Sequence, residues 1–508
     1  MGEGRGKLRR ARDHRGDRSM MAHIPDHVLT APTWTAMLAW WHGRPDPAVL
    51  VGTTTWSGAE LLERAAGAAE HLESVTGRTG PVPALVTSTP ASLAYVIGGA
   101  SVDRPLAPLG PRLTVRELAP CLDGLGSDVL LTETEFAPLA AALAEGRDVE
   151  VVAIDDPPRS GRPLDLDPRD DSTAFVLHTS GTTGVPKAVA YRQDRLALRT
   201  RVNVGLCSLR PGAVYATASP FHHIAGFGNH AVALAAGAAL APLPRFTVEA
   251  WTALADVGVT HALTVPTMLE MLLEADALAL PALEVLQYGG APIHPQTLRQ
   301  TLAAVPSVGL VNIFGQTEGS PITCLTSGDH RRIAGAGRDD LLNSVGRAAP
   351  GVEVRIDRPD GAGIGEVIAR SPHLMSVGDD GWLHTGDLGH LDAEGYLFLA
   401  GRRGDKIIRG GENIYPVEVE QVLEMHPSVR EAAVIGIPDQ RWGETVKAVV
   451  VPADPAAPPD AETLRIHARR ELAGFKVPTR WEIADALPRN ASGKLLRRQL
   501  MANRRTNQ

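Results

Sequence analysis

Three short apolar segments, each followed directly by a loop that contains glycine, most strongly limit how this chain can fold. They cover residues 174–178, 283–288 and 310–314, and apolar runs alternate with helical patterns through most of the chain. Alternating strands and helices are typical of an α/β protein. Ligands of open α/β sheets bind beyond the carboxyl ends of the strands. We therefore expect an α/β fold with a site in these loops.

A change of pattern near residue 345 indicates a second folding unit. Short strands separated by Asp-Gly and Glu-Gly turns begin there, and residues 401–411 then hold five charged residues and four glycines. A chain of 508 residues is also too long for one ordinary core. We predict a large N-terminal α/β domain over residues 20–400, a hinge loop over 401–411 and a small, mobile α+β domain over 412–508.

Composition narrows the possible partners. The net charge of -8 argues against nucleic acid, and no apolar run approaches the roughly 20 residues of a membrane helix. The three cysteines lack metal-ligand spacing, so we expect free thiols and a cytoplasmic protein.

Residues 1–19 are basic and polar without the apolar core of a signal peptide, which predicts a disordered leader. Met20 or Met21 is then a candidate start.

Residues 179–187 carry the central chemical signal, with the sequence Thr-Ser-Gly-Thr-Thr-Gly-Val-Pro-Lys. Glycines let backbone N–H groups turn toward an anion, hydroxyls add donors, and a lysine neutralises phosphate charge. Only six of the 50 basic residues are lysine, so a lysine in this loop favours a particular use. The Gly-Lys-Ser/Thr ending of a Walker A loop is absent.

This loop resembles the phosphate loop of the adenylate-forming superfamily, which includes acyl-CoA synthetases, adenylation domains and firefly luciferase. Six further segments resemble motifs of the same superfamily and follow in its order; they are residues 220–226, 289–292, 314–318, 382–389, 401–413 and 488–494. The resemblance implies a large N-terminal domain of adenylate-forming type and an acid–thiol ligase. Such an enzyme uses ATP to convert an acid to acyl-AMP and then passes the acyl group to a thiol.

The resemblance also implies roles for individual residues. The phosphates of ATP are assigned to Thr179, Ser180, Gly181, Thr182, Thr183, Gly184 and Lys187. The rest of the nucleotide site is assigned to Gly289, Gly290, Ala291, Asn312, Phe314, Gly315, Thr317, Asp387 and Arg402. In this set Phe314 stacks on adenine and Asp387 accepts the ribose hydroxyls. Glu318 is the predicted Mg²⁺ ligand, because magnesium takes carboxylate and phosphate oxygens. Catalysis is assigned to Lys494, Lys187 and His223, with Lys494 bridging the carboxylate and the α-phosphate.

The same resemblance outlines the acid pocket and the thiol site. The implied pocket residues are His223, Phe227, Asn229, Tyr288, Gly289, Phe314, Gly315 and Pro321. Aromatic walls with few charges indicate a small aryl or short acyl acid. Gly411 is expected to let a pantetheine arm pass, and Lys476 to lie near the nucleotide end of CoA.

Several alternatives stay open. The acceptor can instead be the phosphopantetheine of an acyl carrier protein or an amine, and some relatives activate an inorganic acid. A nucleotide-binding protein without turnover is a further reading, although Glu318 and Lys494 argue against it. The oligomeric state is open. Gly404 departs from the superfamily, which has Asp or Lys at this hinge position, and glycine widens the backbone freedom there.

Overall fold

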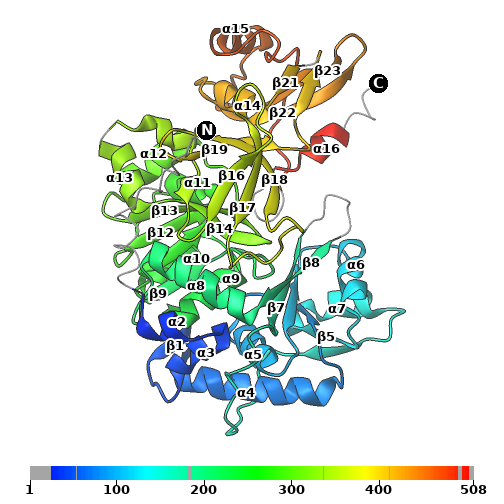
Figure 1. Ribbon diagram of the computed structural model, residues 1–508, viewed down its shortest axis with the longest axis vertical. Helices are drawn as coiled ribbons and strands as arrows, with labels where there is room; N and C mark the ends of the chain where they lie inside the picture. Colours follow the sequence, from blue (N-terminus) through cyan, green and yellow to red (C-terminus); the bar gives the residue numbers. More distant parts are fainter. Residues whose placement is uncertain are drawn as a thin grey trace, which may run out of the picture.

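The computed structural model describes residues 24–52, 54–179, 186–335, 337–410, 412–489 and 495–502, except for the side chains of Arg498 and Ala502. Figure 1 shows a small domain at the top and a large domain with two neighbouring sheets below it. The predicted leader, Ser180, Gly181, Thr182, Thr183, Gly184, Gly411 and Lys494 lie outside the described residues.

The first sheet of the large domain contains the strand that precedes the phosphate loop. Its strand order is β6 (Glu150–Ala153), β5 (Val129–Thr132), β3 (Val82–Leu85), β4 (Leu106–Leu109), β7 (Thr173–Thr179) and β8 (Lys187–Arg192). All neighbours are parallel except β7 and β8, which form an antiparallel pair. The helices of this part of the chain are α4 (Gly58–Val75), α5 (Pro90–Ser101), α6 (Val115–Leu125) and α7 (Ala137–Ala144).

The second sheet carries the other predicted loops. Its strand order is β15 (Arg347–Ala348), β14 (Gly319–Leu325), β13 (Gly309–Gln316), β12 (Val285–Gly289), β11 (His261–Thr264), β9 (Val214–Thr217), β10 (Ala239–Leu240), β1 (Pro47–Val51) and β2 (Thr54–Ser57). The strands from β13 to β1 are parallel, as expected for the alternating pattern.

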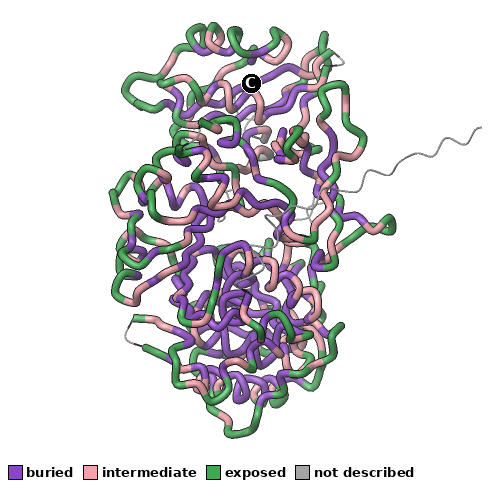
Figure 2. Tube along the Cα trace, turned by 60° about the vertical axis from the view of Figure 1, so that its left-hand side comes forward, coloured by how far each residue is buried: buried purple, intermediate pink, exposed green. Residues whose placement is uncertain are grey.

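Helices with buried faces separate and cover these sheets. They are α2 (Asp26–Thr30), α3 (Trp34–Met37), α8 (Gln193–Cys207), α9 (Phe227–Ala235), α10 (Val248–Thr252), α11 (Pro266–Glu274), α12 (Pro295–Ala304) and α13 (Ser327–Gly335), with short 3-10 turns at Leu38–Trp41, Thr134–Phe136, Ala253–Ala255 and Asp339–Asn343. One apolar cluster extends across both sheets, and Phe175 of β7 meets Phe227 of α9 at a ring distance of 4.5 Å. Figure 2 shows this interior as a continuous buried trace. The core therefore fixes α8 and α9 against the strands that carry the site.

The chain then forms two smaller units. An antiparallel sheet contains β16 (Glu353–Asp357), β17 (Gly365–Arg370), β18 (Leu383–Leu391) and β19 (Leu397–Arg402). The small domain contains β20 (Ile407–Arg409), β21 (Glu412–Ile414), α14 (Pro416–Glu424), β22 (Val429–Asp439), β23 (Gly443–Pro452), α15 (Ala461–Glu471), β24 (Arg480–Ile483) and α16 (Arg497–Ala502). None of the helices in the described ranges has the length and apolar character needed to span a membrane.

The segment predicted as a hinge loop is partly regular. Arg402 is the last residue of β19, and Ile407–Arg409 forms β20. The reason is burial, because Ile407 is 1% exposed within the apolar cluster of the small domain. Only residues 403–406 lie between the two strands. The pivot predicted within 401–411 is therefore limited to a few residues outside the strands, and Gly404 is one of these residues.

Candidate active site

Strands β7 and β8, which flank the predicted phosphate loop, form an antiparallel pair. Thr179 at the end of β7 is paired with Lys187 at the start of β8, and the Thr179 hydroxyl lies 3.5 Å from the Lys187 carbonyl oxygen to which it donates. Lys187 is exposed. The two predicted phosphate residues that the structure describes are therefore held side by side by paired strands, at the carboxyl end of β7.

A buried tyrosine joins this hairpin to the turn that contains Glu318. The Tyr191 hydroxyl on β8 donates a hydrogen bond to the Thr317 carbonyl, in the turn between β13 and β14. The Glu318 carbonyl accepts a 2.8 Å hydrogen bond from the Met375 N–H, which holds the turn from its other side. The strand that begins with Lys187 and the turn that carries the predicted magnesium ligand are thus one connected unit.

The predicted adenine loop lies at the carboxyl end of β12, where backbone packing requires glycine. A Cβ on Gly289 would lie 2.8 Å from the Ile313 carbonyl oxygen, and Gly290 has a φ of +83°. On the next strand, the Asn312 Nδ2 donates to the Tyr288 carbonyl at 3.2 Å. The Asn312 Oδ1 is buried and has no partner among the described atoms, so it can accept an amino hydrogen of a bound ligand.

Ala291 follows these glycines, and two predicted neighbours on β13 lie at the same edge. Phe314 is half-buried and packs against an apolar cluster under β14. A Cβ on Gly315 would lie 2.7 Å from the Ser320 Cβ, so the strand pair closes only with glycine there. The structure therefore brings this part of the predicted nucleotide set together.

The ribose motif places Asp387 and Arg402 directly opposite each other on β18 and β19. The Arg402 Nε lies 2.7 Å from the Asp387 Oδ1, and the arginine side chain is 40% exposed whereas the aspartate side chain is 11% exposed. The Asp387 N–H donates to the Thr385 hydroxyl oxygen at 3.0 Å. Arg402 therefore shields the carboxylate and fixes its orientation at the end of the large domain.

The predicted catalytic histidine lies just before α9. The ring centroids of His222 and His223 are 4.2 Å apart. Burial lowers the pKa of His223 to about 4. Burial, the neighbouring His223 and Arg112 lower the pKa of His222 to about 3. Both imidazoles are therefore neutral at pH 7, and His223 can contribute a hydrogen bond or a packing surface but not a positive charge.

On the small domain, Lys476 is engaged by a carboxylate. Its Nζ donates to both carboxylate oxygens of Glu418, at 2.6 and 2.8 Å. Trp442 lies over Gly410, where an added Cβ would be 2.8 Å from the indole ring. Gly410 is therefore required beneath the indole, next to the position expected to border a pantetheine arm.

The residues that flank positions 490–494, among them the predicted Lys494, are held by described contacts. Arg489 forms an isolated β-bridge with Leu495, and the Leu496 N–H donates to the Pro488 carbonyl at 2.8 Å. Beyond it, Arg497 pairs with Glu420 and lies 3.3 Å from Asp405. The Arg497 contacts connect the start of α16 to α14 and to the segment that follows Gly404.

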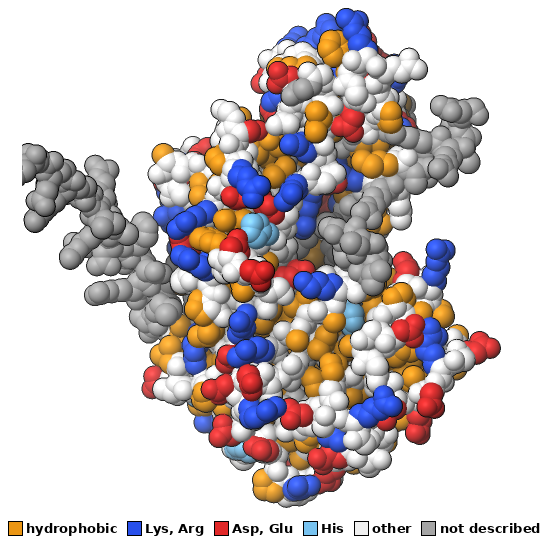
Figure 3. All heavy atoms as spheres, turned by 45° about the vertical axis from the view of Figure 1, so that its right-hand side comes forward, with side chains coloured by type: hydrophobic (Ala, Val, Ile, Leu, Met, Phe, Trp, Pro, Cys, Tyr) orange, Lys and Arg blue, Asp and Glu red, His pale blue; other side chains and the backbone are white. Residues whose placement is uncertain are grey.

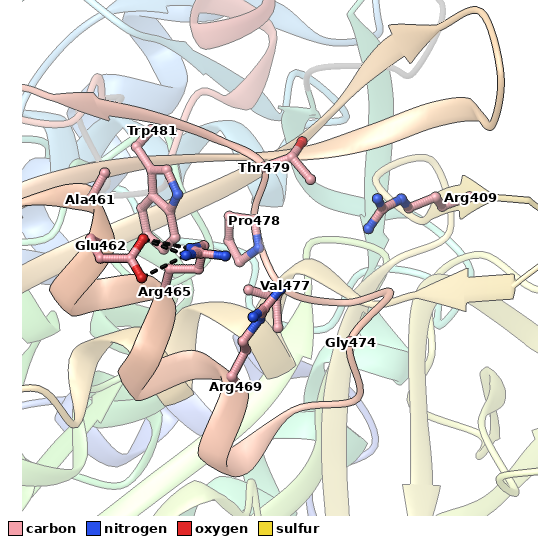
Figure 4. A pocket seen from close by; sticks show the side chains of 10 residues that line it. All are labelled: Arg409, Ala461, Glu462, Arg465, Arg469, Gly474, Val477, Pro478, Thr479 and Trp481. Atoms are coloured by element: carbon pink, nitrogen blue, oxygen red, sulfur yellow. Dashed lines mark hydrogen bonds and ion pairs between the residues drawn. The ribbon is translucent and has the colours of Figure 1, made fainter.

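A cavity of about 430 Å³ opens on the small domain beside the segment that contains Lys476. It is lined by Arg409, Ala461, Glu462, Arg465, Arg469, Gly474, Val477, Pro478, Thr479 and Trp481. Figure 4 shows Arg465 and Arg469 coming from α15 and Arg409 from the opposite side of the cavity. Arg465 is paired with Glu462, and Arg409 donates to the Phe475 carbonyl at 2.6 Å. The cavity is therefore basic and partly aromatic, which suits a phosphorylated ligand.

Two residues of this region were not predicted from the sequence. Tyr191 has no motif around it, although its place in the alternating pattern of β8 indicates that it faces inward. Arg199 of α8 is 2% exposed. An arginine in a helix is ordinarily expected at the surface. The burial of Arg199 is therefore apparent only from the packing of α9 over α8.

With this geometry in place, a family model described as AMP-binding enzyme matches residues 38–377, and the AMP-binding enzyme C-terminal domain matches residues 418–494. This chain is an AMP-binding enzyme. The predicted place in the adenylate-forming superfamily is thereby confirmed. The two matches fall on the large and the small domain.

Relatives of this AMP-binding enzyme are named for different acceptors. The fatty acid–[acyl-carrier-protein] ligase ScoC of Streptomyces coeruleorubidus is 35% identical over 78% of this chain and 81% of its own. The indoleacetate–CoA ligase of Aromatoleum aromaticum is 33% identical over 88% of this chain and 92% of its own. The amide bond synthetase McbA of Marinactinospora thermotolerans superposes with a TM-score of 0.83 at 30% identity, over 92% of this chain and 98% of that one. This likeness confirms the predicted fold class, a large α/β domain with a smaller C-terminal domain.

Proposed function

We propose that this AMP-binding enzyme activates a small carboxylic acid, aryl or short acyl, and transfers it to the thiol of CoA. In the first step a carboxylate oxygen attacks the α-phosphorus of ATP, and pyrophosphate leaves. In the second step the thiol sulfur attacks the acyl carbonyl carbon, the thiol proton is released, and AMP leaves with the bridging oxygen. Nucleotidyl transfer needs mainly positioned charge from the protein.

The observation that carries this proposal is the hydrogen bond from Tyr191 to the Thr317 carbonyl. It joins the strand that begins with Lys187 to the turn that carries Glu318. A phosphate-binding cation and a carboxylate held in one unit suit a magnesium-bound polyphosphate. Lys187 and the loop 180–184 would hold the β- and γ-phosphates, and Glu318 would hold Mg²⁺, which neutralises phosphate charge when bound.

The remaining nucleotide groups have matching partners in this proposal. The buried Asn312 Oδ1, with no partner among the described atoms, would accept the amino group of adenine. Phe314 would stack on the ring, and Gly289, Gly290 and Ala291 would let it lie against backbone. Asp387, already oriented by Arg402, would accept the ribose hydroxyls, and Lys494 would bridge the acid and the α-phosphate.

CoA is the acceptor that the small domain favours. The basic cavity adjoins the segment that carries Lys476, and Arg469 faces it from α15. CoA carries three phosphate groups and an adenine at the end remote from its thiol, so cations beside Trp481 suit it. The phosphopantetheine of a carrier protein is a second candidate, favoured by the likeness to ScoC. Because ATP and CoA are cytoplasmic metabolites, we also propose a cytoplasmic location.

Figure 3 shows acidic and basic side chains interspersed over the face of the large domain that it presents. The oligomeric state stays open, and the absence of a nucleic-acid partner remains a prediction.

The function is tested with a panel of aryl and short-chain acids. Each acid is incubated with ATP and magnesium, with CoA, with a phosphopantetheinylated carrier protein or with a simple amine, and the AMP and the acyl product are quantified. We expect at least one acid to give AMP and acyl-CoA in equal amounts. ATP consumption that no acid in the panel stimulates would contradict the proposal.

Arg469 tests the CoA site separately from acid activation. We expect Arg469→Ala to raise the KM for CoA about two- to fivefold, the size of an exposed charge–phosphate contact. The rate of acid-dependent pyrophosphate exchange should not change. Arg470→Ala is the matched control, because Arg470 is exposed and its side chain does not line the cavity. An unchanged KM for CoA in Arg469→Ala would place the nucleotide end of CoA elsewhere.

Gly404 tests the proposed alternation of the small domain between the two half-reactions. Proline fixes φ near -65° and restricts the preceding residue, so Gly404→Pro should slow one half-reaction about tenfold or more and spare the other. The two rates are pyrophosphate exchange and thioester formation from preformed acyl-AMP. Gly404→Ala is the control, since a Cβ there has nothing within 4 Å. Normal rates of both steps in Gly404→Pro would move the pivot to another residue.

A further inference from the structure

A buried arginine, Arg199 of α8, lies beneath the first turn of α9 with its charge uncompensated. It is 2% exposed, its Nη1 donates to the Gly228 carbonyl at 2.8 Å, and its Nη2 donates to the Asn229 Oδ1 at 3.3 Å. Its Nε is buried and has no partner among the described atoms. The titratable groups that face it are Tyr191, Tyr215 and Cys207, together with His373, and all of these are neutral at pH 7.

The guanidinium contacts one residue of the proposed acid pocket directly. Asn229, its partner on α9, belongs to the pocket set named from the superfamily resemblance. The Arg199 charge also acts on His373, whose ring Nε2 lies 2.9 Å from the carbonyl oxygen of Pro321, a second member of that set. Burial, with a smaller contribution from the Arg199 charge, lowers the pKa of His373 to about 4. The His373 imidazole is therefore uncharged at pH 7.

Other buried polar atoms in this region also lack protein partners. The hydroxyls of Ser219 and Thr200 have none among the described atoms. The His230 ring lies 6.5 Å from that of Tyr215 and 6.0 Å from that of Phe221, measured between centroids. Buried polar groups are ordinarily paired, because an unpaired one costs free energy. Their concentration under α9 is explained if a polar ligand group or bound water completes them.

We infer that Arg199 selects acids that carry a second, anionic oxygen group at the end remote from the reacting carboxylate. An isolated buried charge is strongly unfavourable, and pairing it with an anion removes much of that cost. A guanidinium with an unused N–H also suits a carboxylate geometrically. The inference rests on the proposed function and narrows its substrate class from small acids in general to dianionic ones. It also replaces the expectation that the walls of the acid pocket carry few charges, because a buried guanidinium lies beside the pocket.

A purely structural role for Arg199 has a different consequence. Its two hydrogen bonds also fasten α8 to α9, so removing them lowers stability whichever acid is used. Selection of a dianionic acid instead changes the ratio of kcat/KM between acids. This ratio is the informative measurement, because a general loss of folded enzyme cancels in it.

The experiment compares acid pairs that differ only in the second carboxylate, such as benzoate with terephthalate and propanoate with succinate. Acid-dependent pyrophosphate exchange gives kcat/KM for each acid. We expect the wild-type enzyme to prefer the dicarboxylate of at least one pair. Arg199→Met should lower kcat/KM for that dicarboxylate about 10- to 100-fold, the effect of removing a charged hydrogen bond. The kcat/KM for the matching monocarboxylate should change much less.

Arg201→Met is the control, because Arg201 lies on the same helix but donates to the Val28 carbonyl, away from α9. It should leave the ratio unchanged. If Arg199→Met does not fold, Arg199→Lys and the wild-type preference still decide the question. A wild-type preference for monocarboxylates, or a ratio that Arg199→Met leaves unaltered, would overturn the inference while the proposed function stands. Exchange with no acid of either kind would contradict the proposed function itself.

Discussion

Lys494→Ala should lose most acyl-AMP formation, about 100- to 1,000-fold in kcat, while thioester formation from preformed acyl-AMP stays largely intact. The reason is that negative charge on the α-phosphate and the attacking carboxylate must be neutralised only in the first transition state. The residues on either side of positions 490–494, Arg489 and Leu495, form a β-bridge with each other. The two half-reactions are measured separately with wild-type and variant enzyme.

Lys447→Ala serves as the control, because Lys447 lies on β23 and its charge is already paired with Glu482. It should leave both half-reactions near the wild-type rates. Equal losses in the two half-reactions of Lys494→Ala would contradict the role assigned to this lysine.

Glu318→Gln should weaken the use of magnesium–ATP, lowering the rate about 10- to 100-fold at limiting magnesium, the effect of removing a charged partner. Glutamine keeps the shape of the side chain but removes the anionic oxygen that magnesium prefers. High magnesium should recover part of the rate, and the KM for the acid should change little. The measurement is a magnesium titration of pyrophosphate exchange.

Glu284→Gln is the control for the charge change, since Glu284 pairs with Arg210 at the surface. Its magnesium titration should match that of the wild type. A titration of Glu318→Gln that also matches the wild type would remove Glu318 as a magnesium ligand.

The fold was largely predictable where short-range patterns determine it. The segment 174–178 became part of β7, 283–288 overlaps β12, and 310–314 became part of β13. What the pattern did not predict is the joining of β1 and β2 to the far edge of the second sheet. That pairing links residues nearly 200 positions apart, as in the Val49–Leu240 pair, and no local signal specifies it.

The sequence predicted which residues belong to the candidate site, but it did not predict the contacts between them. Motifs named Asp387 and Arg402 separately, whereas their 2.7 Å ion pair follows from the register of β18 and β19. Lys476 was expected near CoA, and the structure pairs it with Glu418. Arg199 was not predicted because α8 is covered on more than one side, so its burial depends on distant chain segments.

The central claim is that the acid becomes an acyl-AMP, and oxygen transfer tests it most directly. The enzyme is given an acid labelled with heavy oxygen in its carboxylate, together with ATP and the acceptor thiol, and the AMP is analysed by mass spectrometry. The account predicts one labelled oxygen in AMP and none in pyrophosphate, because the bridging oxygen of acyl-AMP stays with AMP when the thiol attacks. AMP without label, or label recovered in inorganic phosphate beside ADP, would contradict it.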